Sequence, residues 1–268
     1  MNYELIVFDL DDTLLNKDHQ LSKKTVANIN KLKNLGKKVT IATGRMFVSA
    51  LPYAEKLEVE LPLISYNGAY VCHPLSHEVI YHKPVAEDIV QDIIIEAENN
   101  ELHLNLYYGD DFYIEERNKG VEIYEEIAGI KGNAIGRLSS NYKGEATKLL
   151  IIEPDEKKKK YFLDYFKENY GARLEITESK EYFIEMMAKD VSKKKALEEL
   201  ANSLNISREK VVTVGNGFND LEMIKWANLG IAVDNAPQAV KDKADLVAGH
   251  HDSEGVADIL EEIFDIQD

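Results

Sequence analysis

The chain has 268 residues, 44% of them hydrophobic and 30% charged, so it is long enough to bury a sizeable core and is not a disordered protein. Its formal net charge of −16 argues against a nucleic-acid partner, because such partners bind to basic surfaces. The single cysteine, Cys72, excludes an internal disulfide and a cysteine-based zinc site.

The first third of the chain alternates predicted strands and helices. A helix is expected to begin after Ser22, a suitable N-cap, and to end at Gly36, because its apolar residues recur at helical spacing. A second helix contains Pro52 or is broken near it. Three strands are expected, at residues 3–8, 37–43 and 62–71, and the third runs into a turn.

The middle of the chain has a different pattern. It is expected to form a helix, two strands, a helix, a strand, a helix and two strands, with hairpins at residues 103–116 and 173–187. Adjacent strands of this kind predict an antiparallel sheet that carries helices. We therefore predict an inserted α+β domain at residues 83–188 within an α/β core domain made of residues 1–82 and 189–268.

The last third returns to alternating strands and helices. Helices are expected after Ser192, from about Asn219, and through Phe264 at the end, with strands at residues 211–215, 229–233 and 244–248. Strands that alternate with helices predict a parallel sheet with helices on both faces.

No predicted element indicates a membrane protein. No apolar run approaches the about 20 residues that span a bilayer. The chain begins with a strand pattern instead of a signal peptide. We expect a cytoplasmic protein without a membrane partner, and the sequence leaves its oligomeric state undetermined.

Polar residues follow several predicted core strands at the points where the strands end. Ligands of open α/β sheets bind at this edge, so we expect these residues to converge there. The residues are Asp9, Asp11, Asp12 and Thr13 after the first strand, Thr43, Gly44 and Arg45 after the second, Asn67 and Gly68 after the third, Asn216, Asn219 and Asp220 after the strand at 211–215, and the trio Lys193–Lys195 before it.

Four of these segments resemble the motifs of the haloacid dehalogenase superfamily, in the order that the family shows. FDLDDTL (8–14) resembles its D-x-D-x-T motif, IATGR (41–45) its threonine motif, VSKKKALEEL (191–200) its lysine motif, and VGNGFNDLEM (214–223) its acidic motif. SYNGAYV (65–71) and the insert of about a hundred residues resemble the Cof-type phosphatases, which carry a C2 (IIB) α+β cap. The resemblance spans essentially the whole chain and implies a Rossmann-like core with a cap.

The resemblance implies phosphoryl transfer through an aspartyl-phosphate. Asp9 would attack phosphorus and Asp11 would serve as acid and then base, which is chemistry that carboxylates at a strand end can perform. Anion attacking anion requires a cation, and Mg²⁺ suits oxygen ligands. The implied metal ligands are Asp9, Asp11 through its backbone carbonyl, Asn216 and Asp220, and the implied phosphate or substrate contacts are Thr43, Gly44, Arg45, Asn67, Lys193 and Asn219.

The chain departs from the family at Asn216, where an aspartate is usual. An amide oxygen still coordinates Mg²⁺ but brings no charge, so we expect weaker metal binding, with Asp220 supplying the charge directly or through water. Structural roles compete with several of these assignments. Asp9 and Asp11 could cap turns, Asp12 and Asn235 are expected in turns, Arg45 and Asn67 could brace loops, Lys194 and Lys195 are expected in solvent, and His73, His77 and His82 are expected at the surface.

The sequence thus predicts a Mg²⁺-dependent phosphatase acting on small phosphorylated metabolites, such as sugar phosphates or nucleotide-like cofactors. A phosphomutase using the same aspartyl-phosphate is the alternative, and free phosphate as the product would distinguish the phosphatase. A phospho-accepting signalling domain also pairs strand-end acids with Thr and Lys, but it needs neither Asp11 nor a cap.

Overall fold

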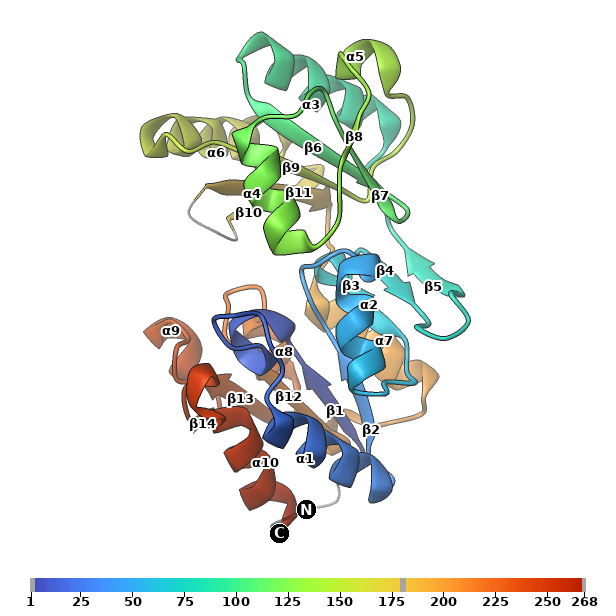
Figure 1. Ribbon diagram of the computed structural model, residues 1–268, viewed down its shortest axis with the longest axis vertical. Helices are drawn as coiled ribbons and strands as arrows, with labels where there is room; N and C mark the ends of the chain where they lie inside the picture. Colours follow the sequence, from blue (N-terminus) through green and yellow to red (C-terminus); the bar gives the residue numbers. More distant parts are fainter. Residues whose placement is uncertain (1–2, 179–181, 267–268) are drawn as a thin grey trace. The chain divides into compact units, whose positions relative to one another are not determined.

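The protein is described by a computed structural model that covers residues 3–178 and 182–266 (Figure 1). The chain divides into two compact units. We call them the core unit, Met1–Tyr81 with Ser192–Asp268, and the inserted unit, His82–Val191.

The core unit is built on a five-stranded sheet in which every pair of neighbours is parallel, as predicted. The position of β1 matters for the site, because β1 lies between β12 and β2. The strands, in their order across the sheet, are β14 (Leu246–Ala248), β13 (Leu229–Val233), β12 (Val211–Gly215), β1 (Leu5–Phe8) and β2 (Lys38–Ile41).

Both faces of this sheet are buried under helices, which explains why β1 reads as a continuous apolar run. Leu5 and Val7 pack in a cluster with Leu197, on the side of the sheet covered by α7 and α8. Ile6 and Phe8 face the other side, under α1 and α10, which lie against each other (Figure 1). The helices are α1 (Lys23–Asn34), α7 (Lys193–Ser203), α8 (Leu221–Trp226), α9 (Gln238–Lys241) and α10 (Gly255–Phe264).

The predicted ends of the first helix are confirmed. The Ser22 side chain accepts a hydrogen bond from the Thr25 backbone N–H, and Gly36 follows the helix with φ of +75°. The next helix, α2 (Phe47–Lys56), contains Pro52. Local capping chemistry therefore fixes where the first helix begins and ends.

The third predicted strand, residues 62–71, is corrected by the structure. It is two antiparallel strands, β3 (Leu63–Ser65) and β4 (Tyr70–Cys72), around a turn at Tyr66–Gly68. Together with β5 (Val79–His82) they form a separate three-stranded sheet. A parallel bridge from Ala42 to Ile64 joins β3 to the end of β2.

The inserted unit contains a six-stranded sheet, and the predicted order of its main elements is confirmed. The sheet is mixed instead of purely antiparallel, because β7 pairs in parallel with a two-residue strand, β8, too short to show a sequence pattern. The turn at residues 179–181 of the second predicted hairpin lies outside the described residues. The strands, in order across the sheet, are β10 (Leu174–Glu178), β11 (Phe183–Ala188), β9 (Lys148–Ile152), β6 (His103–Tyr108), β7 (Asp111–Ile114) and β8 (Asn133–Ala134), and the helices are α3 (Glu87–Asn99), α4 (Lys119–Ala128), α5 (Leu138–Asn141) and α6 (Glu156–Tyr170).

The helices in the described part of the chain fall short of what a bilayer-spanning helix requires. Within residues 3–178 and 182–266, none is both long and apolar enough to cross a membrane.

Candidate active site

The candidate site lies where three neighbouring parallel strands end. Asp9 follows β1, Thr43 comes two residues after β2, and Asn216 follows β12. The Asp9 backbone N–H donates to the Val214 carbonyl at 2.9 Å, which continues the pairing of β1 with β12 up to the site. Asp9 is therefore held by an interior strand of the core sheet, with its carboxylate buried.

Lys193 joins two carboxylates inside the core unit. Its ammonium group donates to Asp9 Oδ1 and to Asp220 Oδ1, each at 2.6 Å, and all three side chains are buried. Ser192 caps α7 by accepting the Lys195 N–H, which fixes the first turn of the helix that carries Lys193. Lys194, by contrast, pairs with Glu198 on the helix surface. Of Lys193 and Lys194, it is Lys193 that lies inside the core unit, as predicted.

The electrostatics of this cluster are unbalanced toward negative charge. Burial raises the pKa of Asp9 to about 7, with the neighbouring Asp220 and Asp11 acting in the same direction and Lys193 opposing the rise. Burial lowers the pKa of Lys193, but the carboxylates of Asp220 and Asp9 outweigh this and raise it. Lys193 thus stays charged, and the ionised form of Asp9 lacks sufficient positive charge nearby.

Asp220 organises the loop that follows β12. Its Oδ2 atom accepts the backbone N–H groups of Asn216 at 2.9 Å and Gly217 at 2.8 Å, while Oδ1 accepts Lys193. Gly215 permits this arrangement, because a Cβ atom there would lie 2.6 Å from Asp220 Cβ. The carboxylate therefore uses much of its acceptor capacity to hold the loop and the lysine in place.

The amide of Asn216 lies beside the turn that follows β1. Its Oδ1 atom accepts the hydroxyl of Thr13 at 3.2 Å. Thr13 belongs to the tight turn at Leu10–Leu14, in which Asp12 has φ of +56°. The amide oxygen of Asn216 is thus close to the loop that carries Asp9 and Asp11.

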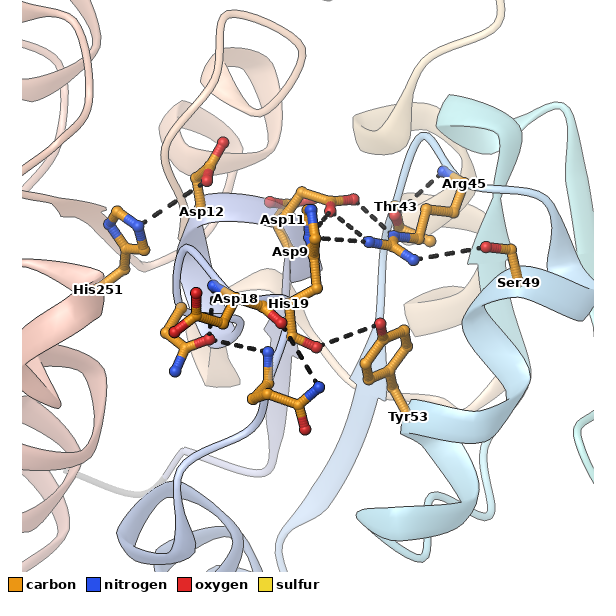
Figure 2. Close-up of polar contacts among 12 residues, drawn as sticks. Asp9, Asp11, Asp12, Asp18, His19, Thr43, Arg45, Ser49, Tyr53 and His251 are labelled. Carbon is orange, nitrogen blue, oxygen red and sulfur yellow. Dashed lines mark hydrogen bonds and ion pairs between the residues drawn. The ribbon is translucent and has the colours of Figure 1, made fainter. Parts of the chain in front are cut away.

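Asp11 forms a bidentate ion pair with Arg45 (Figure 2). The guanidinium donates from Nε to Oδ2 at 2.8 Å and from Nη2 to Oδ1 at 2.6 Å. His19 Nδ1 lies 3.6 Å from Asp11 Oδ1, and the Arg45 guanidinium lies over the ring of Tyr53. Asp11 is therefore oriented chiefly by Arg45, which faces both of its carboxylate oxygens.

The remaining predicted residues link the strand ends to one another. The Thr43 hydroxyl accepts the Arg45 N–H at 3.1 Å, and the Thr43 carbonyl accepts the Asn67 N–H at 2.9 Å. Asn219 donates its amide to Asn67 Oδ1 at 3.0 Å. Gly44 packs on the same amide, since a Cβ atom there would lie 3.1 Å from Asn67 Oδ1.

All ten predicted site residues thus form one connected cluster in the core unit. Sequence reasoning did not include Thr13 as a partner of Asn216, and it gave no role to His19 or Tyr53. A single histidine in a polar loop carries no signal of its own. His19 approaches Asp11 only because the loop that carries His19 folds back toward α2.

Gly68 packs closely against the start of α7, the helix that carries Lys193. Gly68 has φ of +100°, and a Cβ atom there would lie 2.4 Å from the Ser192 carbonyl oxygen at the start of α7. Gly68→Ala is therefore expected to lower the free energy of unfolding by more than ~2 kcal/mol, because left-handed backbone strain and a backbone clash add. Urea denaturation measures the change.

Gly36→Ala is the matched control for this prediction. Gly36 has φ of +75°, and no atom lies within 4 Å of the point that a Cβ atom would occupy, so alanine there incurs only the backbone strain of ~1–2 kcal/mol. Equal losses at the two positions would mean that the approach of Gly68 to α7 contributes nothing.

The donors at the site fit a hard divalent cation. The Asp9 carboxylate and the Asn216 amide supply oxygen ligands, which Mg²⁺ prefers. Lys193 occupies only Oδ1 of Asp9 among the described residues. The raised pKa of Asp9 reflects burial and neighbouring negative charge, which a cation would offset.

Known proteins resemble this chain over nearly its whole length. The 5-amino-6-(5-phospho-D-ribitylamino)uracil phosphatase YitU of Bacillus subtilis is 28% identical over 275 residues, covering 98% of both chains. A haloacid dehalogenase-like hydrolase from Bacteroides thetaiotaomicron shares 27% identity with a TM-score of 0.91, covering 98% of this chain and 100% of the other. The protein TM0651 from Thermotoga maritima shares 32% identity with a TM-score of 0.87, covering 97% of both.

A family model agrees with these similarities and with the predicted resemblance. The model, described as haloacid dehalogenase-like hydrolase, matches residues 6–260, which include the core strands, the inserted unit and all ten site residues. Membership in this family implies a divalent metal. The chain belongs to the haloacid dehalogenase-like hydrolases, in the Cof-type branch that carries an inserted α+β cap.

Proposed function

We propose that this hydrolase is a Mg²⁺-dependent phosphatase that cleaves small phosphorylated metabolites through an aspartyl-phosphate. The observation that carries the proposal is the state of Asp9 at the end of β1. Its Oδ1 is fixed by Lys193 at 2.6 Å, whereas Oδ2 accepts no hydrogen bond from the described residues. A carboxylate held by one oxygen, with the other available, is suited to nucleophilic attack.

In the first step, Asp9 Oδ2 attacks phosphorus and the bond to the leaving oxygen breaks. Asp11 gives a proton to that oxygen, so the product leaves as an alcohol. Lys193 and the hydroxyl of Thr43, which accepts the Arg45 N–H and keeps its own proton to donate, would stabilise the negative charge on the transferring oxygens. In the second step, Asp11 takes a proton from water, the water oxygen bonds to phosphorus, and the bond to Asp9 breaks to release phosphate.

The ion pair with Arg45 would determine when Asp11 carries a proton. Its guanidinium faces both oxygens of Asp11, which favours the ionised carboxylate. A substrate phosphate would compete for the same guanidinium, because Arg binds phosphate and carboxylate with similar geometry. Asp11 would then lose its counter-ion and accept a proton, as the first step requires.

The proposed metal ligands are Asp9, the backbone carbonyl of Asp11 and the side chain of Asn216. Bound Mg²⁺ would supply positive charge that offsets the repulsion between the Asp9 carboxylate and the substrate phosphate. Asp220 already accepts three hydrogen bonds, from Lys193 and two backbone N–H groups, so it is better placed to act through water than as a direct ligand.

Asn216→Asp tests this ligand assignment. Adding a negative charge at the metal is expected to lower the Mg²⁺ concentration for half-maximal activity by about tenfold, which corresponds to ~1.4 kcal/mol and is of the order of one added charge at short range. Activity is measured as phosphate release over a Mg²⁺ titration. Asn202→Asp, at an exposed position of α7, adds the same charge elsewhere and is expected to leave the titration unchanged.

The substrate class is tested with a panel of phosphorylated compounds. YitU is named as a phosphatase of a phosphorylated ribitylamino-uracil, so that compound belongs in the panel together with sugar phosphates and phosphorylated nucleotide-like cofactors. Release of free phosphate, dependent on Mg²⁺ and abolished by EDTA, supports the phosphatase. Recovery of an isomerised phosphosugar without free phosphate would identify a mutase instead.

A further inference from the structure

A second cluster of potential metal ligands lies beside the turn that follows Asp9. The segment before α10 carries His250, His251 and Asp252, and one potential ligand atom from each lies within 4.8 Å of the others. This segment packs against the turn at Leu10–Leu14. It brings the imidazole of His251 next to the carboxylate of Asp12, as the dashed line in Figure 2 shows.

The spacing of the groups around His251 suits coordination better than hydrogen bonding. His251 Nε2 lies 3.8 Å from Asp12 Oδ1 and 3.6 Å from Asp252 Oδ1. Both distances are too long for a hydrogen bond. Ligands around one tetrahedral metal with bonds of about 2.0–2.1 Å are separated by about 3.4 Å, so small side-chain movements would bring these atoms to a common ion.

The imidazole of His251 is also buried without a partner for its other nitrogen. The side chain is 9% exposed, and Nδ1 accepts or donates no hydrogen bond among the described residues. An unpaired buried polar atom costs about 1–3 kcal/mol, so its retention calls for an explanation.

A second unpaired atom lies in the same neighbourhood. Asn235 donates its amide N–H to the Asp12 carbonyl at 2.8 Å, and its own Oδ1 is buried without a partner among the described residues. A histidine that binds a metal through Nε2 carries its proton on Nδ1 and usually donates it to an oxygen. Asn235 Oδ1 and His251 Nδ1 are not hydrogen-bonded to each other, so a side-chain movement would be needed before Asn235 could accept that proton.

We propose that His251, Asp252, Asp12 and His250 form a binding site for a divalent transition metal of the Zn²⁺, Co²⁺ or Ni²⁺ class, distinct from the Mg²⁺ site at Asp9. Imidazole ligands favour these metals over Mg²⁺, which prefers oxygen alone. The Asp12 and Asp252 side chains are 55% and 35% exposed, so they leave the site open to solvent. His250 Nδ1 accepts the Asp252 N–H at 3.3 Å, which is long for a hydrogen bond. A metal would therefore displace this contact at little cost.

Metal at this site would connect two segments of the core unit. Asp12 belongs to the turn that also carries Asp11, whereas the histidines precede α10. A bound ion joins them by coordination in place of the long contacts of His251. Binding should therefore stabilise the core unit against unfolding as well as occupy the site.

The test is binding of Zn²⁺ to the full chain in the presence of excess Mg²⁺, measured by titration calorimetry. We expect one Zn²⁺ per chain, bound at least ~10-fold more weakly after His250→Gln/His251→Gln, because loss of even an outer-shell partner of a metal ligand costs 10–100-fold. His77→Gln, at an exposed histidine of the core unit whose ring lies edge-on to Phe47, is expected to bind Zn²⁺ as the wild type does.

Two further measurements keep the outcome independent of any folding defect in the double variant. Asp252→Asn retains an oxygen for the Lys17 N–H but loses the charge, and it should also weaken Zn²⁺ binding. In the wild type, Zn²⁺ should shift the imidazole ¹⁵N resonances of His250 and His251. Absence of Zn²⁺ binding by the wild type, or equal binding by the folded double variant, would overturn the proposal.

Discussion

Asp9→Asn is expected to lower the turnover of any phosphorylated substrate by at least ~10⁴-fold, the scale seen when a covalent nucleophile is removed. The substituted amide keeps the size of the side chain and still offers Oδ1 to Lys193, so the fold should persist. What it loses is the nucleophilic oxygen that bonds to phosphorus. Phosphate release at saturating substrate and Mg²⁺ measures the effect.

Asp18→Asn provides the matched control for this substitution. Asp18 lies in the loop that follows the Leu10–Leu14 turn, is exposed, and contacts Asn16 through its backbone N–H (Figure 2). Its replacement should leave turnover within about twofold of the wild type, as is usual for exposed positions away from a site. If Asp9→Asn were as active as Asp18→Asn, the attacking group would have to be another residue.

Lys193→Met is expected to remove about 3–5 kcal/mol from the free energy of unfolding, on the scale of breaking a buried ion pair, and to abolish turnover. The side chain is completely buried between Asp9 and Asp220, so methionine leaves two buried carboxylates without their counter-ion. Lys194→Met, one residue away, removes only a surface pair with Glu198 and should cost less than ~1 kcal/mol. Urea denaturation of both variants gives the comparison.

The pH dependence of wild-type stability tests the electrostatic state of Asp9. Burial and the neighbouring carboxylates raise the pKa of folded Asp9 to about 7, above its ordinary value of 3.8. Between these pH values the folded state binds more protons, so the penalty of the ionised carboxylate grows as pH rises and disappears below the unfolded pKa. In metal-free buffer, the free energy of unfolding of the wild type should therefore fall by more than that of Asp9→Asn as pH rises from about 4 toward about 7, because the variant lacks the titrating carboxyl. Equal pH dependence of the two proteins would mean that Asp9 is not held in a destabilising ionised form.

The core sheet could be predicted because its strands are buried on both faces and its first helix carries its own start and stop signals. β1 is four apolar residues, and Ser22 and Gly36 mark the ends of α1 by local chemistry. The third strand was wrong as one unit because the chain reverses at Tyr66 and Asn67, which have positive φ, and neither residue type signals a left-handed backbone as strongly as glycine.

The members of the candidate site could be predicted because parallel strands end at one edge, whereas their partners could not. The sequence predicted Lys193 beside Asp9, since both belong to recognisable motifs. It did not indicate that Arg45 would face both oxygens of Asp11, because that pairing depends on how α2 and the loop after β1 approach each other. Asp220 was expected near the metal, and its use as a support for two backbone N–H groups follows only from the folded loop.

The most direct test of the account is detection of a phosphoryl group on Asp9 itself. The wild type would be mixed with its best substrate and Mg²⁺, quenched in acid within the first turnover, and digested for peptide mass spectrometry. We expect a phosphorylated peptide containing residues 8–14, with the added mass on Asp9 and absent from Asp9→Asn. Turnover at the normal rate with no phosphoryl group on Asp9 at any quench time, or a phosphoryl group on another residue, would contradict the account.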